Sequence, residues 1–382
     1  MSDKIPGLPT PTLNFSMKSA NKAPPKSVQR KPVMLHIKAI PDSNTIEVKH
    51  FDHDIGAFIY ARSGNVKLLD NERLDGLDHS SLILGGLSPK PAEINPGDFA
   101  FNFISDPDQN SKALDDAIDF VEKNQIHCLN HPAKVKRMTR DGLYQQFGEL
   151  EGVVIPKTLR VSPRYDSDIR EMVEAGDISL PMIVRPAGGH DGKNMLLVES
   201  LDDIRELQSF AFNGSDYFLI EFQDYCGADG FYRKYRMMWI NGKAYPRHLI
   251  LDRKWNIHGK NRENHMVDNE QLRNEEIAFY KDPESSLGAR NYALVHKIFT
   301  GIGLDYCGMD FSILPNGDLV IFEANAAMNA VSTDPTALHK ESLIGDVFDY
   351  QNAYWQEQEK AKVSMLREAA ALGVGSQSTP TN

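Results

Sequence analysis

Two acidic residues and an amide in the C-terminal part of the chain have the spacing expected of a metal site. Asp310 precedes, and Glu323 and Asn325 follow, a turn that contains the dipeptide Asn316-Gly317. An Asn-Gly pair between two runs of alternating apolar and polar residues predicts a β-hairpin with a two-residue loop. Counting outward from that loop places Asp310 opposite Glu323. Because side chains alternate along a strand, Asn325 lies on the same face as Glu323.

Two carboxylates that face each other across a strand pair repel, so the arrangement needs a cation or a shared proton between them. Oxygen ligands without a neighbouring His or Cys suit a hard ion such as Mg2+, which commonly keeps water and phosphate oxygens as further ligands. Asp310, Glu323 and Asn325 are therefore candidate metal ligands. One alternative is an acid pair on a solvated face. A shared proton for acid–base chemistry is another, and no neighbouring residue supports it.

The same count predicts the rest of this hairpin. It pairs Leu314 with Leu319 and Ser312 with Ile321. The opposite, core-facing side then collects five residues: Phe311, Ile313, Val320, Phe322 and Ala324. The hairpin is thus expected to have one polar face and one buried face.

A second Asn-Gly pair, Asn241-Gly242, predicts another hairpin. Counting outward from it places Arg236 opposite Arg247 and Tyr235 opposite His248. Two arginines that face each other on one side of a sheet favour an anion between them. Chance pairing on a solvated face is the competing interpretation.

A glycine-rich loop lies between two apolar runs, Met182–Val184 and Met195–Val198. Glycine lets backbone N–H groups approach an anion closely, and the planar guanidinium of Arg185, just before the loop, suits phosphate oxygens. The loop departs from the Walker motif, because Ala187 and Asn194 stand where that motif requires Gly and Ser or Thr. A turn without a ligand is the simpler interpretation. The glycines of the loop are Gly188, Gly189 and Gly192.

The elements that position these residues read as alternating strands and helices, which predicts a mixed α/β and α+β chain. A small α/β domain is expected over residues 33–130, with a strand at 33–40 and a hairpin of 58–61 with 66–69. Helical periodicity appears at six segments: 114–126, 133–147, 165–175, 201–212, 289–300 and 350–372. The ends, 1–32 and 373–382, are rich in proline or small polar residues and are predicted to be disordered.

Polar segments between these elements are further candidates for function. Asn102, Asp106 and Asp108 follow a predicted strand, where such residues bind ligands or cap loops. Residues 221–225 end an apolar run and are expected to link two lobes. Residues 252–274 are charged and lack periodicity, which predicts a long mobile loop of the kind that forms lids.

Composition limits the class of protein. A length of 382 residues allows two or three lobes, and the net charge of −11 disfavours nucleic acid as a partner. Three widely spaced cysteines without a CxxC pair indicate buried thiols in a reducing compartment. No apolar run reaches the roughly 18 residues that span a bilayer, and the first residues lack a signal-peptide pattern. We therefore expect a cytoplasmic protein without a membrane partner.

The glycine-rich loop, the EFQDY segment and the hairpin with its Asp, Glu and Asn together resemble the ATP-grasp superfamily, which includes D-alanine–D-alanine ligase and glutathione synthetase. The chain looks most like the ATP-grasp modules associated with tetratricopeptide-repeat proteins, through FNFISDPD, LNHP, TRDG, VRPAGGHDG, RHL and WNIH. The resemblance covers Val33 to about Gly345. It implies an ATP-grasp fold: a pre-ATP-grasp domain (33–130), a two-lobed ATP-grasp domain (131–345) with its hinge near 221–225, and a C-terminal helix (346–372).

The resemblance also implies ATP between the two lobes and Mg2+ or Mn2+ on Asp310, Glu323 and Asn325. Arg185 stands where the family usually has a phosphate-binding lysine, and Arg and Lys differ in geometry. The implied catalytic residues are Arg236, which matches the arginine that stabilises the acyl phosphate, and Arg247. The implied nucleotide-binding residues are Arg140, Arg185, Gly188, Gly189, Gly192, Glu221, Phe222, Asp224 and Asp229.

The activity that the resemblance implies is ligation of a carboxylate to an amine. ATP would phosphorylate a small-molecule or peptide carboxylate, and an amine would attack the acyl phosphate. Two other functions remain open at this point: an ATP-grasp phosphotransferase that acts on a small molecule, and a non-catalytic nucleotide-binding protein. Family ligases are often dimers or tetramers, so a homodimer is one expectation.

Overall fold

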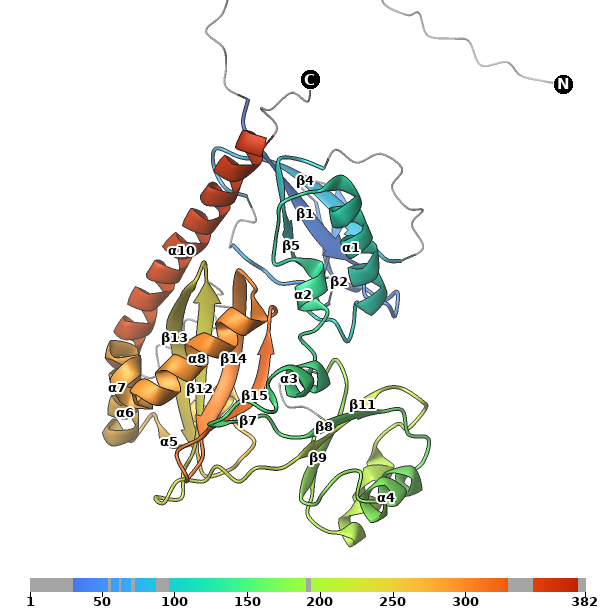
Figure 1. The fold of residues 1–382 in the computed structure, drawn as a ribbon, viewed down its shortest axis with the longest axis vertical. Helices are drawn as coiled ribbons and strands as arrows, with labels where there is room; N and C mark the ends of the chain where they lie inside the picture. Colours follow the sequence, from blue (N-terminus) through green and yellow to red (C-terminus); the bar gives the residue numbers. More distant parts are fainter. Residues whose placement is uncertain are drawn as a thin grey trace, which may run out of the picture. The chain divides into compact units, whose positions relative to one another are not determined.

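The computed structural model describes residues 30–53, 56–61, 63–69, 73–86, 96–189, 194–328 and 346–376. Most of the two predicted tails and Gly192 of the glycine-rich loop lie outside these residues. Within them the chain mixes helices with parallel and antiparallel sheets, as the alternation of strands and helices predicts (Figure 1).

The N-terminal sheet is parallel and has the strand order β4-β1-β5-β6. Its strands are β1 (Val33–Ala39), β4 (Asp78–Leu84), β5 (Phe99–Asn102) and β6 (Cys128–Leu129), and helix α1 (Ser111–Asn124) follows β5. The apolar residues of α1 recur at helical spacing and are buried, so one side of the helix covers the core.

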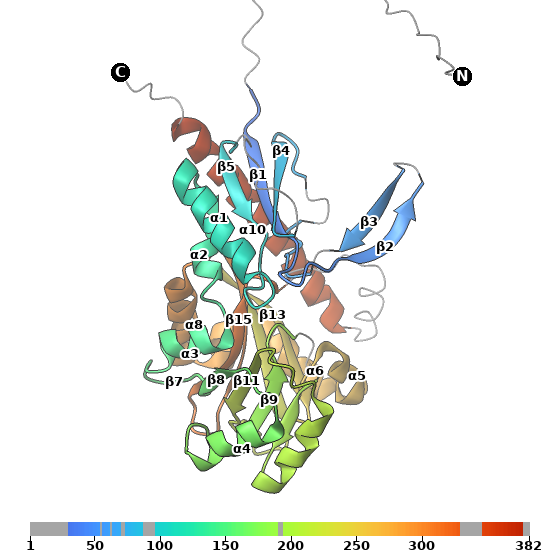
Figure 2. The ribbon, with the colours of Figure 1, turned by 90° about the vertical axis from the view of Figure 1, so that its right-hand side faces the viewer.

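The predicted hairpin of residues 58–61 with 66–69 is wrong. Strand β3 (Ala57–Ala61) pairs instead with β2 (Glu47–Asp52), and Figure 2 shows this two-stranded ribbon extending away from its neighbours. Val66 and Leu68 are buried because they pack in the apolar cluster that contains Phe99, and Val66 N donates to Phe103 O. Their apolar character therefore reflects core packing rather than strand pairing.

A second, antiparallel sheet has the order β10-β9-β11-β8. It comprises β8 (Thr158–Val161), β9 (Met182–Pro186), β10 (Leu196–Val198) and β11 (Tyr217–Glu221), with helices α4 (Asp166–Glu174) and η1 (Leu201–Ser209) in the same apolar cluster. Pro156 separates β8 from β7 (Val153–Val154), and the two strands belong to different sheets. The segment 133–147 likewise forms two helices, α2 (Pro132–Val135) and α3 (Arg140–Phe147), because the Thr139 side chain caps the second.

The largest sheet has the order β13-β12-β14-β15-β7 and carries most of the candidate site. Its long strands are β12 (Tyr232–Ile240), β13 (Lys243–Asp252), β14 (Tyr306–Ile313) and β15 (Leu319–Asn325). Helix α8 (Ala289–Ile302) shares a core cluster with them, and Phe299 stacks on Trp239.

The predicted loop at 252–274 is also different in the structure. It contains η2 (Gly259–Asn261) and α5 (Arg262–His265), and α6 (Glu270–Lys281) begins inside it; α7 (Pro283–Leu287) follows. Met266 and Leu272 are buried, and Asp252 accepts hydrogen bonds from the side chains of Asn261 and Asn264. Short helices held by such local bonds give little hydrophobic periodicity, which explains the different prediction.

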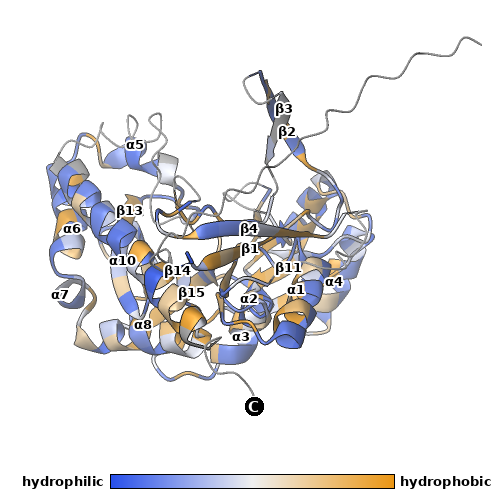
Figure 3. Ribbon diagram, turned by 90° about the horizontal axis from the view of Figure 1, so that it is seen from above, coloured by the Kyte–Doolittle hydropathy of each residue, from blue (hydrophilic) through white to orange (hydrophobic). Residues whose placement is uncertain are grey.

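Helix α10 (Asp346–Ser376) closes the described chain and continues four residues past the predicted end at Leu372. Hydrophilic and hydrophobic residues alternate along it (Figure 3), and Met365, Leu366 and Ala369 pack against the cluster of β1 and β5. None of the helices among the described residues combines the length and the apolar content needed to cross a membrane.

The two Asn-Gly hairpins differ from a simple outward count. In β14–β15 the connection spans 314–318, so Ile313 pairs with Leu319 and Ser312 with Val320, and the predicted pairs of Leu314 and Ser312 are wrong. A β-bulge between Asp310 and Phe311 then shifts the register by one and brings Asp310 opposite Glu323 as predicted.

In β12–β13 the predicted two-residue loop is present, because Ile240 pairs with Lys243. A bulge follows at Arg247, so Arg236 faces His248 and Tyr235 faces Leu249. The predicted pairing of Arg236 with Arg247 is therefore wrong, and so is that of Tyr235 with His248. A bulge inserts one extra residue into one strand, so every pair beyond the bulge is shifted by one residue.

Candidate active site

A cavity of about 940 Å³ lies over the polar face of the largest sheet. Side chains of β12–β15 line it together with residues of α3, β9 and β11 and of the segment 255–263. Cavities of this size accommodate a nucleotide and a small substrate.

Four charged or polar residues form a row across the sheet at this cavity. His248 on β13 pairs with Arg236 on β12, Arg236 pairs with Asp310 on β14, and Asp310 pairs with Glu323 on β15. We refer to these four residues as the cross-sheet row. Neighbouring strands are about 4.8 Å apart, so the row extends over roughly 14 Å.

Asp310 is the most buried member of the row, with 1% of its surface exposed. Its carboxylate accepts two hydrogen bonds from Arg236, one of them 2.7 Å from Nη2, and Lys234 Nζ lies 3.0 Å from Oδ2. Burial alone would raise the pKa of Asp310, but the charges of Arg236 and Lys234 outweigh it and hold that pKa below its usual range. The carboxylate is therefore ionised at neutral pH.

Glu323 accepts a hydrogen bond from Arg140 Nη2. Burial and the neighbouring Asp310 raise its pKa, whereas Arg140, Lys234 and Arg185 lower it, and the net pKa lies below the usual value. The row therefore presents two ionised carboxylates side by side, held in place by cations.

The carboxylates of Asp310 and Glu323 are suitable ligands for a hard divalent cation, because both are ionised. They line the cavity together with Arg140 and Arg185, the candidates for phosphate binding. Asn325 also lines the cavity, but its Oδ1 accepts hydrogen bonds from Ala327 N and Met328 N, each at 3.0 Å. Its amide would have to turn to contribute an oxygen to a metal. Among the described residues there is no group of three or more His, Cys, Asp or Glu that could hold a metal.

Arg140 and Arg185, the two candidates for phosphate binding, both line the cavity near Glu323. Arg185 is 6% exposed, and burial, with the nearby charge of Arg140, lowers the pKa of Arg185 to about 10. It donates to the carbonyl of Gly189 at the start of the glycine-rich loop. Gly188 has a φ of 70°, and its carbonyl accepts a hydrogen bond of 2.9 Å from Gln109. Gly192 lies outside the described residues.

The segment expected to bind the base of a nucleotide divides into two parts. Glu221 and Phe222 line the cavity, and Phe222 N donates to Pro181 O. Asp224 and Asp229 are not among the described residues that line it. Asp229 instead pairs with Arg233 at 2.7 Å, and the hydrogen bond from Arg233 lowers the pKa of Asp229 to about 2.

Arg247, predicted as a catalytic arginine opposite Arg236, lies in the bulge of β13. It lines the cavity, with 8% of its surface exposed, and its guanidinium lies over the ring of Trp355, 5.3 Å from the centroid. It contributes positive charge one residue away from the cross-sheet row.

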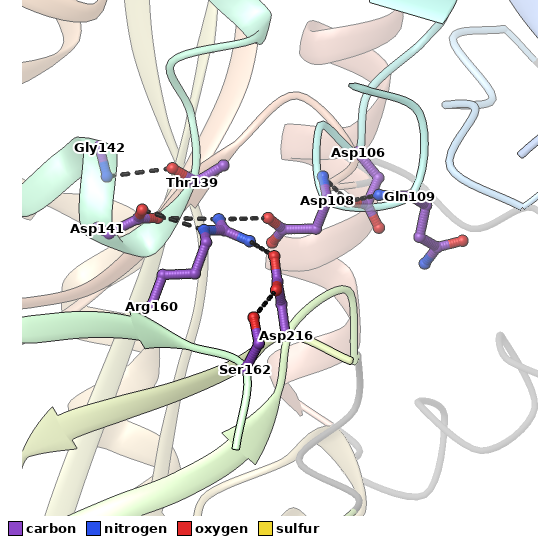
Figure 4. A network of polar contacts seen from close by, with 9 residues as sticks. All are labelled: Asp106, Asp108, Gln109, Thr139, Asp141, Gly142, Arg160, Ser162 and Asp216. Carbon is purple, nitrogen blue, oxygen red and sulfur yellow. Dashed lines mark hydrogen bonds and ion pairs between the residues drawn. The ribbon is translucent and has the colours of Figure 1, made fainter. Parts of the chain in front are cut away.

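Lys234 and Arg160 are two further charged residues of the site that were not predicted from the sequence. Lys234 precedes Arg236 by two residues, so the alternation of a strand places it on the same face, and this signal was available. Arg160 on β8 binds three carboxylates (Figure 4): Asp108 at 2.7 Å, Asp141 at 3.0 Å and Asp216 at 3.4 Å. No local sequence pattern predicts the role of Arg160, because its three partners come from distant segments of the chain.

This network connects the loop after β5 to α3, whose first residue is Arg140. Asp108 is therefore an ion-pair partner. Asn102 and Asp106 serve as loop caps: Asn102 Oδ1 accepts from Ile104 N, and Asp106 Oδ1 accepts from the backbone of Asp108 and Gln109. The network positions Arg140 beside Glu323.

Comparison with known proteins gives likenesses of fold. No protein-family model matches the chain, and no curated protein matches it. Among solved structures it is similar to a RimK domain protein ATP-grasp from Sphaerobacter thermophilus, with 12% identity, 83% of this chain and 99% of that chain covered, and a TM-score of 0.44. It is also similar to D-alanine–D-alanine ligase from Bacillus anthracis complexed with ATP, with 12% identity, 86% and 98% coverage, and a TM-score of 0.42. An N5-carboxyaminoimidazole ribonucleotide synthetase matches at 13% identity, 78% and 71% coverage, and a TM-score of 0.42.

Proposed function

We propose that the protein is an ATP- and Mg2+-dependent ligase that activates a substrate carboxylate as an acyl phosphate and joins it to an amine. The observation that carries the proposal is the cross-sheet row. Arg236, Asp310 and Glu323 are in register on three adjacent strands, at a cavity of about 940 Å³ that Arg140, Arg185 and Lys234 also line. This arrangement combines metal-binding carboxylates with the cations that a phosphoryl transfer requires.

Each residue has a role in this proposal. Asp310 and Glu323 would hold Mg2+, or Mn2+, which when bound neutralises charge on the phosphate oxygens. Arg140 and Arg185 bind phosphate oxygens at the Glu323 end of the row. Arg236, whose charge is already directed at Asp310, faces the group being transferred. Glu221 and Phe222 contact the base and ribose side of the nucleotide.

The reaction proceeds in two balanced steps. An oxygen of the substrate carboxylate bonds to the γ-phosphorus while the bond from that phosphorus to the leaving oxygen of ADP breaks. The amine nitrogen then bonds to the acyl carbon, inorganic phosphate leaves, and the nitrogen loses a proton to solvent. Arginine and lysine side chains neutralise charge in both steps, and the protein needs no covalent nucleophile.

Hydroxylamine separates this ligase from an ATP-grasp phosphotransferase. It replaces the unknown amine and converts an acyl phosphate into a stable hydroxamate, whereas a phosphorylated hydroxyl gives none. We expect hydroxamate from at least one acid in a panel of carboxylic acids with ATP and Mg2+, and none after EDTA. Phosphorylated product without hydroxamate would establish the phosphotransferase, and ATP binding without turnover would indicate a binding protein.

The matched variants are Glu323→Gln and Glu174→Gln. Glu174 lies on α4 in an exposed ion pair with Arg170 at 3.9 Å, so its variant should keep the hydroxamate yield. Glu323→Gln removes a charge from the proposed metal site and should abolish the yield. We also expect a cytoplasmic protein whose partners are small-molecule or peptide carboxylates and amines, and size-exclusion chromatography would test for a homodimer.

A further inference from the structure

The end of the cross-sheet row opposite Glu323 carries positive charge that the proposed chemistry does not use. There, Arg247 and His248 on β13 lie with Arg262 of α5, and all three line the cavity. We call these three residues the distal cationic cluster. They are 8%, 9% and 6% exposed, so an anion bound among them would be largely shielded from water.

His248 supplies a polar atom without a partner beside the cavity. Its Nε2 is buried and has no hydrogen-bond partner among the described residues. Burial, reinforced by the charges of Arg236, Arg262, Arg247 and Lys234, holds the pKa of His248 well below its usual value. The ring is therefore neutral, and its tautomer with the proton on Nε2 can donate one N–H to an acceptor.

Charge favours an anionic acceptor. Among the described residues that line the cavity, six are Lys or Arg and four are Asp or Glu. Two of those four, Asp310 and Glu323, lie at the end of the row proposed to bind the metal, which we call the metal end. They bind Arg236, Lys234 and Arg140 there. Arg262 has an acidic partner, the fully buried Glu276, behind it. Glu263, next to Arg262 in the sequence, also lines the cavity, but it is exposed, whereas Arg247 and Arg262 are buried. The buried wall at this end of the cavity therefore carries positive charge.

Distance separates the cluster from the nucleotide. His248 is one strand from Arg236 and two strands from Asp310, which corresponds to about 5 Å and about 10 Å. A phosphate held at Asp310 and Glu323 therefore does not reach His248. Ile250, two residues after His248 on β13, and Ile257 also line the cavity and offer apolar contacts for a short aliphatic segment.

We propose that the carboxylate substrate carries a second anionic group, which binds in the distal cationic cluster and accepts a hydrogen bond from His248 Nε2. The proposal rests on the ligase function proposed above. The carboxylate that is phosphorylated lies at Arg236, and the second group lies one strand further along the row. The substrate class is a small dicarboxylate or a related dianion with about 5 Å between its two charges.

The test compares acids matched in carbon number. With hydroxylamine, ATP and Mg2+, the diacids succinate, glutarate and adipate are measured against butyrate, valerate and hexanoate. We expect the best diacid to exceed its matched monoacid at least tenfold in kcat/KM, because an unpaired charge at the cluster disfavours the monoacid. Equal kcat/KM values for diacids and monoacids would overturn the proposal.

Variants of His248 test whether the distal cationic cluster causes the preference for diacids. His248→Ala should raise KM for the best diacid about tenfold, with little change in kcat or in the KM for ATP. His248→Gln retains an N–H near the position of Nε2 and should recover part of the loss. A rise in the KM for ATP instead would show that the cluster belongs to the nucleotide and would refute the assignment. The wild-type acid series stands even if the alanine variant fails to fold.

A binding measurement distinguishes failure of this proposal from failure of the ligase function. If no acid yields hydroxamate, the ligase function is wrong. Calorimetry with the non-hydrolysable analogue AMP-PNP, Mg2+ and the same acids still tests the cluster. Diacid binding that weakens in His248→Ala supports the anion site, and equal or absent binding of both acid classes rejects it.

Discussion

The β12–β13 and β14–β15 hairpins both turn at an Asn-Gly pair, and both contain one β-bulge beside the cross-sheet row. In β13 the extra residue is Arg247, directly before His248; in β15 it is Phe322, directly before Glu323. All four of these residues line the cavity. In a regular strand, consecutive side chains point to opposite faces, so each bulge adds one side chain to the site that regular pairing would direct away from it.

The hairpins differ in what the extra residue supplies and in the length of the turn. The β13 bulge adds a cation at the distal end of the row, and the β15 bulge adds an aromatic ring at the metal end. The β12–β13 loop has two residues, whereas the β14–β15 connection spans 314–318. The metal end therefore depends on a long turn and a bulge that compensate each other, and the distal end depends on the bulge alone.

The largest expected effect comes from Asp310 on β14, which pairs with Arg236 of the other hairpin and with Glu323 of its own. Asp310→Ala leaves Arg236 and Lys234 without their buried partner, so we expect the free energy of unfolding to fall by about 3 kcal/mol. ATP turnover should fall at least 1000-fold, because metal and phosphate positioning are lost together. Urea denaturation and ADP release measure the two effects. Asp310→Asn, which retains the shape, should lose turnover with a smaller loss of stability; normal turnover in it would remove Asp310 from the metal site.

The next comparison separates the two arginines. Arg236 is in the row beside Asp310, and Arg247 is in the bulge, so Arg236→Ala should lower kcat about 100-fold or more. Arg247→Ala should lower kcat/KM about tenfold, mainly through KM for the carboxylate. Steady-state kinetics with both substrates varied measures the split. Equal losses of kcat in the two variants would show that both arginines contact the transferred group.

How far this site could be predicted from the sequence depends on the bulges. The facing of Asp310 and Glu323 is confirmed, but two deviations from the simple count, a longer turn and a bulge, cancel there. The predicted pairing of Arg236 with Arg247 is wrong, because the β12–β13 hairpin has a bulge but no longer turn to compensate for the register shift. Bulges are stabilised by tertiary contacts, and no local residue pattern specifies them.

The fold shows the same limit. Strands and helices with strong periodicity, such as β1, α4 and α8, lie where the sequence predicts them. Segments whose burial comes from distant partners do not, as Val66 and Leu68 show by packing with Phe99. Arg160 was missed for the same reason, since its three carboxylate partners are brought together only by the tertiary fold.

The two ends of the row should also respond differently to pH. The pKa of His248 is lowered in the folded protein. Below about pH 6.5 the histidine is therefore protonated in the unfolded chain but stays neutral in the folded chain. The free energy of unfolding thus falls as the pH decreases from about 6.5. Asp310 and Glu323 also have lowered pKa values, so their contribution is complete above about pH 4.5 and is lost as pH falls below it. Each group contributes a slope of at most about 1.4 kcal/mol per pH unit.

Urea denaturation between pH 3 and pH 8 measures both steps. His248→Gln should remove part of the decrease between pH 6.5 and 5 and leave the decrease below pH 4.5. Asp310→Asn should weaken the step below pH 4.5. A His248→Gln profile identical to the wild type would mean that the histidine is not held neutral at the distal end.

The smallest expected effect tests whether the two turns are equivalent. Gly242 and Gly317 have φ values of 79° and 90°, and a Cβ at either position would meet no atom within 4 Å. Alanine there is disfavoured only by the backbone conformation, so each variant should lose about 1 kcal/mol of unfolding free energy. Neither should change turnover, because regular strand pairs separate each turn from the bulge and the cavity. If Gly317→Ala alone lowered turnover, the longer turn would be shown to transmit its geometry through the bulge to Glu323, and the metal end would be the more fragile of the two.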